Sequence, residues 1–291
     1  MDKIRLNVLP SPTFGQLGVN FAERAVGELP SDKIWLEGGC TDITGDAVCS
    51  IAAQNGQTVN IIQFINTDKA AHIKTEINAE KYASVSLVQV FACQAPLISQ
   101  LETKLDENAS FDLSQLYIGG LDTVSEIRTT LGGRLSRFNA DIAYTLGTGS
   151  KLDINLIADH YGKKSVSEIN VGGVLNEGSD KVFKGTIDFK SGASGAKGHE
   201  KEDVLLAGDN IRNRIVPVIL CAEEDVEGSH GATSGRIDDD QIFYMRSRGI
   251  PDEQILNILA RAKLARVIGK IDDEQVKQRI FKALGWGDLD D

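Results

Sequence analysis

Three residues in the C-terminal third of the chain carry side chains that can bind iron together: Glu202, Cys221 and His230. A thiolate is a soft iron ligand, and imidazole and carboxylate groups are also found at iron sites. Glu202 precedes Cys221 by 19 residues, which is close to one coil of a β-solenoid with roughly 20 residues per coil. Residues one coil apart stack on the same face, ~4.8 Å apart. The spacing therefore predicts that Glu202 and Cys221 are neighbours.

The surroundings of these residues leave a second interpretation open. Cys221 follows the apolar run 218–220, so the alternation can equally place its side chain in the core. His230 lies among small residues, 228–235, which leave an imidazole accessible to a metal or a partner. The same run is also typical of an ordinary turn. Spacing alone therefore does not decide between a metal site and packing.

The other cysteines show no metal-binding pattern. The chain has four cysteines and no Cys-x-x-Cys pair, which argues against a zinc ribbon or a thioredoxin-type site. In a reducing cytosol all four are expected to be thiols. The remaining three, which we expect to be small buried apolar residues, are Cys40, Cys49 and Cys93.

Composition and missing motifs exclude several functional classes. The net charge of −11 over 291 residues argues against a nucleic-acid partner and, more weakly, against an anionic membrane. The apolar run 215–220 is too short to span a bilayer. No phosphate-binding loop, serine nucleophile elbow or His-Glu-x-x-His motif occurs, so hydrolase and NTPase activities are not supported. The N-terminus resembles no signal peptide, which predicts a cytoplasmic protein.

The residues from about Lys33 to Arg236 are predicted to form many short strands. Apolar and polar residues alternate over four to seven positions, as in 58–64 and 84–90, and turn clusters such as 176–180 separate the runs. The number of strands and the scarcity of aromatics favour a β-solenoid over a propeller. Similar segments that start at Ala109 and Gly149 are compatible with two coils of roughly 20 residues each. A two-sheet sandwich stays the alternative.

Three short helices are predicted after Arg236. Asp238 and Gln241 have the spacing of a capping box, and Ile255, Ile258 and Leu259 belong to an apolar stripe at helical spacing. The predicted organisation is a lead segment over residues 1–33, a β-helix core over 34–236 and a helical C-terminal domain over 237–291.

Two consecutive segments resemble the signature of the SufB/SufD family of iron–sulfur cluster assembly scaffolds. The first contains Ser229-His230-Gly231-Ala232-Thr233, similar to the family's Ser/Glu-His-Gly/Glu-Ala-Thr motif. An acidic stretch follows, and then residues 243–250 match Phe-Tyr-x-Arg-x-Arg-Gly-Ile. Upstream, 203–209 resembles the family's Leu-Leu-x-Gly-Asp coil. The resemblance is clear over roughly residues 185–270.

This resemblance implies a fold, a function and a set of site residues. The fold would be a right-handed parallel β-helix followed by a helical domain. The protein would be a scaffold, not an enzyme, on which transient iron–sulfur clusters form where two scaffold subunits meet, before transfer to acceptor proteins. His230 matches the motif histidine at that interface, and Glu202 falls where SufB-type members carry the interface cysteine. We expect Cys221 to supply the thiolate instead.

The resemblance also implies partners. A Suf-type ABC ATPase would dock on the C-terminal helices; candidate contacts are Phe243, Tyr244, Arg246 and Arg248. The short chain looks more like minimal versions that work as homodimers, although a heterodimer with a paralogous scaffold stays an alternative. Two other functions remain: a metal-free β-helix interaction module, and a β-helix enzyme acting on acidic polysaccharide. The enzyme is less favoured because no groove carboxylate cluster or secretion signal is evident.

Overall fold

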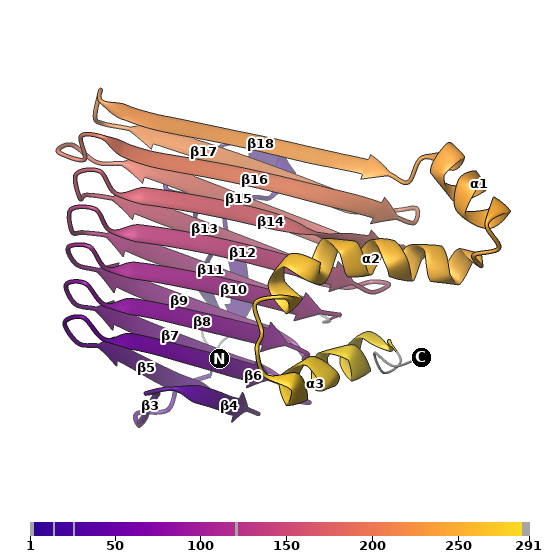
Figure 1. The fold of residues 1–291 in the computed structure, drawn as a ribbon, viewed down its shortest axis with the longest axis horizontal. Helices are drawn as coiled ribbons and strands as arrows, with labels where there is room; N and C mark the ends of the chain where they lie inside the picture. Colours follow the sequence, from indigo (N-terminus) through magenta and orange to yellow (C-terminus); the bar gives the residue numbers. More distant parts are fainter. Residues whose placement is uncertain (1–2, 14, 26, 120–121, 287–291) are drawn as a thin grey trace.

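The computed structural model describes residues 3–13, 15–25, 27–119 and 122–286. Their main body is a flattened parallel β-solenoid built from two facing eight-stranded sheets (Figure 1). The chain alternates between the sheets, so one contains the odd-numbered strands from β3 to β17 and the other the even-numbered strands from β4 to β18. Every pairing within these sheets is parallel, which confirms the β-helix and excludes the two-sheet sandwich.

The two sheets have the following strands. The odd sheet consists of β3 (Lys33–Trp35), β5 (Ala47–Ala53), β7 (Ala71–Ala79), β9 (Leu97–Leu105), β11 (Asp122–Leu131), β13 (Lys151–His160), β15 (Asp180–Phe189) and β17 (Arg212–Cys221). The even sheet consists of β4 (Gly39–Ile43), β6 (Thr58–Ile65), β8 (Ser84–Phe91), β10 (Ser110–Ile118), β12 (Arg137–Leu146), β14 (Val166–Asn176), β16 (Ala196–Ala207) and β18 (Val226–Arg236).

One coil of the solenoid is longer than the sequence suggested. Register partners are 26 residues apart between Ser84 and Ser110, and 31 apart between Val166 and Lys197. The predicted coil of roughly 20 residues is therefore wrong. Each coil contains two strands of up to 12 residues and two turns, and the segments at Ala109 and Gly149 lead into strands of opposite sheets.

Alternate residues of each strand fill the space between the sheets. Aromatic side chains stack there from coil to coil: the Phe111 and Phe138 ring centroids are 5.6 Å apart, and those of Phe91 and Tyr117 are 4.5 Å apart. A stack of this kind holds neighbouring coils in register, because each ring contacts its equivalent on the next strand. The interior is thus a continuous apolar core that also encloses a few polar groups.

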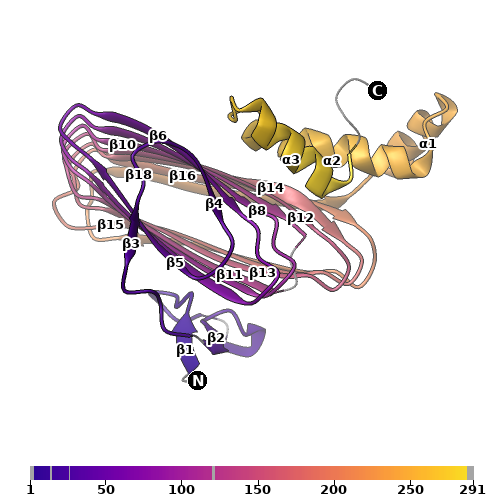
Figure 2. The same ribbon diagram turned by 90° about the horizontal axis from the view of Figure 1, so that it is seen from below.

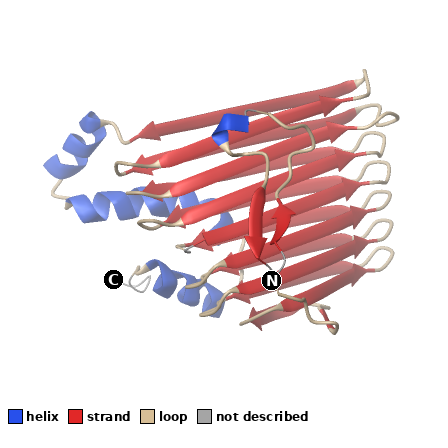
Figure 3. Cartoon of the chain, turned by 180° about the vertical axis from the view of Figure 1, so that it is seen from behind, coloured by secondary structure: helices blue, strands red, loops and turns tan. Residues whose placement is uncertain are grey.

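The N-terminal segment covers the outer face of the odd sheet (Figures 2 and 3). It contains an antiparallel pair, β1 (Lys3–Leu6) and β2 (Ala22–Ala25), and a 3₁₀ turn at Gly15–Leu17. Leu9 and Val19 pack on Val182 and Val216 of the sheet. Deeper in this contact, the buried Lys184 ammonium lies 2.8 Å from Asp153 and donates to the Asn7 carbonyl at 3.1 Å.

Two of the three C-terminal helices cover the opposite sheet (Figure 2). They are α2 (Asp252–Ile268) and α3 (Glu274–Leu284), and their apolar side chains pack on β6, β8, β10 and β12. Helix α1 (Asp239–Ser247) projects past the end of the sheet, and Asp238 caps it by accepting from the Asp240 N–H, as predicted (Figure 1). Among the described residues, no helix combines the length and apolar composition needed to cross a membrane.

Candidate functional site

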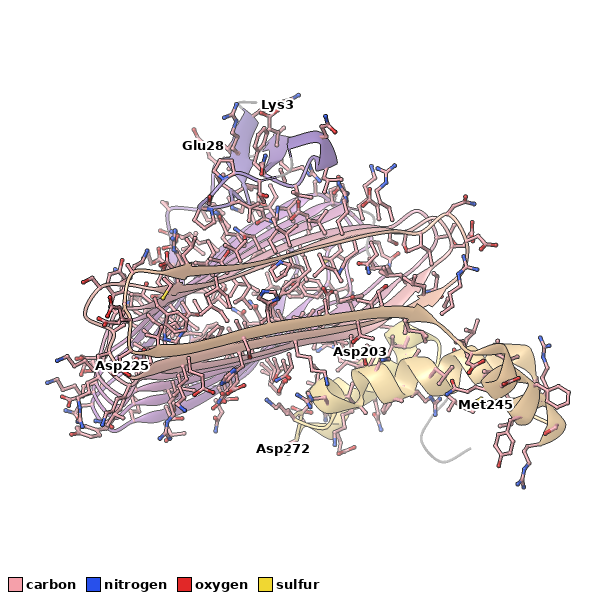
Figure 4. All side chains as sticks on the ribbon, turned by 90° about the horizontal axis from the view of Figure 1, so that it is seen from above. Lys3, Glu28, Asp203, Asp225, Met245 and Asp272 are labelled. Atoms are coloured by element: carbon pink, nitrogen blue, oxygen red, sulfur yellow. The ribbon has the colours of Figure 1, made fainter. Side chains whose placement is uncertain are left out.

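The solenoid ends at β17 and β18, and this end is open. Within the described residues, neither strand has a neighbour on its outer side, and every residue of β18 after Val226 is exposed. Side chains between these two strands face solvent, as the view onto this end shows (Figure 4). An uncovered parallel edge of ten or eleven residues is a template for pairing with another strand.

His230 lies on the inward face of this open end. Its register partner in β16 is Glu200, which is buried between the sheets, and paired residues of a parallel sheet point to the same side. Gly228 has the same orientation, since a Cβ at that position would lie 3.0 Å from the Phe189 ring. The motif histidine is therefore exposed at the mouth of the interior space rather than placed in a turn.

Glu202 is enclosed below the mouth. It is fully buried and forms an ion pair with the equally buried Lys181. The Tyr144 hydroxyl donates to the same carboxylate oxygen, Oε1, at 3.2 Å, while Oε2 has no hydrogen-bond partner. Its register partner in the last coil is Ala232, which has a small exposed side chain. Glu202 is thus one coil away from the open end, two positions along from the partner of His230.

The buried charges perturb one another. Burial raises the pKa of Glu200 to about 8; the nearby Glu202 raises it further and Lys181 opposes the shift. Burial also raises the pKa of Glu202, against the lowering effect of the Lys181 ammonium and of both hydrogen bonds. For Lys181, loss of solvation lowers the pKa and Glu202 opposes this. A charged Lys181–Glu202 pair is therefore stable only while the two groups stay in contact.

Cys221 lies at the far end of the last coil from Glu202. Its register partner is Phe189, whereas Lys181, which binds Glu202, is eight residues earlier in β15. Eight residues of strand correspond to about 26 Å. The predicted stacking of Cys221 on Glu202 is wrong, because it assumed a coil of 19 residues and the two residues belong to opposite sheets. The Cys221 thiol is exposed and donates to the Glu223 carbonyl at 3.0 Å.

One chain does not assemble a metal site from the predicted ligands. His230 and Glu202 lie near each other, but Cys221 is remote from both. In the part of the chain that the structure describes, no three His, Cys, Asp or Glu side chains are grouped closely enough to hold a metal ion. The ligand roles of Cys221, Glu202 and His230 remain predictions, and they need a second subunit to be tested.

Sequence reasoning missed Lys181, Tyr144 and Glu200. Lysine and glutamate in an alternating strand were taken as solvent-facing, although the positions of Lys181 and Phe183 in β15, like those of Glu200 and Glu202 in β16, follow one inward alternation. The phase of that alternation was the available signal.

The other cysteines divide into two groups. Cys49 and Cys93 are buried as expected, and burial raises the pKa of Cys49 to about 11. Cys40 is exposed, which contradicts the prediction; it lies in β4, the first strand of the even sheet, where no earlier coil covers it.

The candidate partner contacts gather on α1. Phe243 is 73% exposed and Tyr244 58% exposed, and the Arg248 guanidinium lies 5.2 Å from the centroid of the Tyr244 ring. Arg246 is in the last turn, and Arg248 is the residue at the C-terminal cap. Large aromatic side chains exposed on a projecting helix are typical of a protein-binding surface.

Comparison with known families agrees with the fold and with the motif around His230. Residues 45–263 match the family model described as SUF system FeS cluster assembly, SufBD core domain. This chain belongs to the SufBD family. SufD of Bacillus subtilis is 30% identical over 165 residues, 56% of this chain and 37% of the relative. SufD of Escherichia coli is 33% identical over 170 residues, 53% of this chain and 40% of the relative.

A SufBD family protein of Mycobacterium leprae is similar over a longer stretch: 29% identical over 200 residues, 62% of this chain and 51% of the relative. The chain thus spans at most about half the length of these SufBD relatives. The shared part includes the coils that carry Glu202, Cys221 and His230, because all three lie within the matched core domain.

Proposed function

We propose that this chain is a scaffold subunit on which iron–sulfur clusters are assembled, at an interface formed by the open ends of two solenoids. The observation that carries this proposal is the position of His230, which faces inward on an edge strand that lacks a neighbour within the described residues. A second subunit that pairs with this edge would cover His230 and the mouth above Glu202. Membership of the SufBD family supports the same function.

The partner at the open end would be a second copy of this chain. A two-fold axis would present Cys221 and His230 from both copies to one interface, which supplies two thiolates and two imidazoles. Mixed thiolate and imidazole ligation is known for iron–sulfur clusters. The chain would act as a binding surface rather than as an enzyme, and the completed cluster would pass to acceptor proteins.

The contribution of Cys221 is testable by anaerobic reconstitution with iron and sulfide. We expect Cys221→Ser to lose more than half of the bound iron and acid-labile sulfide, because serine is a poor ligand for the cluster. Cys40→Ser is the matched control: Cys40 is also exposed but lies in the first even strand, at the opposite end of the solenoid. If Cys221→Ser holds as much cluster as the parent, the ligand assignment is wrong.

The helical domain would dock a SUF-type ABC ATPase through α1. The exposed Phe243 and Tyr244 side chains support this, since buried aromatic anchors dominate many protein interfaces. We expect Phe243→Ala to weaken binding of the purified ATPase by about 30-fold, equivalent to about 2 kcal/mol. Isothermal titration calorimetry measures this directly. Leu17→Ala, a change at an exposed apolar residue on the opposite side of the solenoid, should leave the affinity unchanged.

A further inference from the structure

The interior below the open end contains an unequal set of charges. Lys181 and Glu202 are fully buried and paired, and the Lys181 ammonium also faces the Tyr144 and Phe183 rings at 5.6 and 5.9 Å from their centroids. Glu200 is a second carboxylate, 5% exposed, two residues before Glu202 on the same face of β16. One ammonium thus lies beside two carboxylates.

The position of Glu200 is built into the fold. A Cβ on residue 185 would lie 2.0 Å from Glu200 Oε2, so the carboxylate occupies space that only a glycine leaves. Among the described residues, no side chain or N–H donates a hydrogen bond to this carboxylate. Oε2 of Glu202 is also unpartnered. Buried carboxylates are normally paired with a cation or bound to a metal, so both groups have capacity for a further positive partner.

We propose that Lys181 is the positioning residue that holds Glu202 closed to metal, and that it transfers to Glu200 when iron binds Glu202. This inference rests on the proposed function, because it concerns the same mouth below His230. In the single chain, the ammonium occupies the place that a metal cation would take beside Glu202 Oε1.

The geometry allows the exchange without leaving a charge unpaired. Residues two apart on a strand are separated by about 6.6 Å, which a flexible lysine side chain covers by rotation about its own bonds. After the transfer, Lys181 would pair with Glu200, and both oxygens of Glu202 would face the mouth near His230. A lysine suits this role, since it is a compact point charge, whereas an arginine would hold Glu202 in a two-pronged contact.

The test uses Co²⁺ binding to the purified chain, without sulfide or ATPase, followed by calorimetry and by the visible absorption of Co²⁺. We expect Lys181→Met to bind Co²⁺ at least 10-fold more tightly than the parent, because Glu202 is freed. Lys181→Arg preserves the charge and should bind no more tightly than the parent. The gain should disappear in the double variant Lys181→Met/Glu202→Gln. If Lys181→Met does not fold, Lys181→Gln replaces it in the same comparison.

The role of Glu200 is tested in two backgrounds. With Lys181 present, Glu200→Gln removes the group that receives the ammonium and should weaken Co²⁺ binding at least 5-fold. With Lys181→Met, the same substitution should have no effect. An equal loss in both backgrounds would make Glu200 a direct ligand and overturn the exchange, as would a Lys181→Met protein that binds no more Co²⁺ than the parent. Because no cluster is formed, failure here is distinct from failure of the scaffold function.

Discussion

Replacing Phe138 with alanine should lower the free energy of unfolding by about 3–5 kcal/mol. The Phe138 side chain is fully buried between the sheets and stacks on Phe111 of the preceding even strand, with the ring centroids 5.6 Å apart. The substitution removes both the buried area and the stack, and the flanking strands, paired on either side, have little freedom to fill the cavity. Urea denaturation followed by circular dichroism measures the change.

Phe243→Ala is the matched control for this stability measurement. Phe243 is an exposed phenylalanine on α1, so its removal should change the free energy of unfolding by less than about 0.5 kcal/mol. Equal effects of the two substitutions would contradict the assigned core. Since coils of a solenoid can unfold separately, the transition should be checked for two-state behaviour before the energies are compared.

Ala232→Glu should convert a dimer into monomers. Ala232 is exposed on β18 directly above Glu202, so a glutamate there disturbs little within one chain. In a two-fold dimer the new charge occurs twice and meets the carboxylates of both copies. We expect the dissociation constant to rise at least about 100-fold, equivalent to about 2.7 kcal/mol. Analytical ultracentrifugation over a concentration series measures it.

The control is the same substitution at the other end of the solenoid. Ala52 is exposed on β5, and Ala52→Glu adds an identical charge far from the open end. It should leave the dissociation constant unchanged. A dimer that tolerates Ala232→Glu but dissociates with Ala52→Glu would place the interface at the wrong end.

The sequence was sufficient for the fold because alternation is a local property. Runs such as 84–90 show strand periodicity directly, and the residues after Arg236 show helical spacing and a cap at Asp238. Coil length was not predictable in this way, since turns of unequal length join the strands and the offset between register partners grows from 26 to 31 residues. That error alone placed Cys221 beside Glu202.

The interior charges were beyond sequence patterns for a different reason. A lysine in an alternating strand normally faces water, and only the three-dimensional pairing of β15 across the interior from β16 reveals that Lys181 reaches Glu202. The family resemblance identified His230 and the position of Glu202 correctly within the last coils. It carried no information about the cation already bound to that carboxylate.

The most direct test of cluster assembly at the open end is iron and acid-labile sulfide analysis of the reconstituted chain after separation by size under anaerobic conditions. We predict that the cluster elutes with the dimer of the parent and of Ala52→Glu, and that the Ala232→Glu monomer holds almost none. A monomer of Ala232→Glu that retains as much iron and sulfide as the parent would contradict an interfacial cluster.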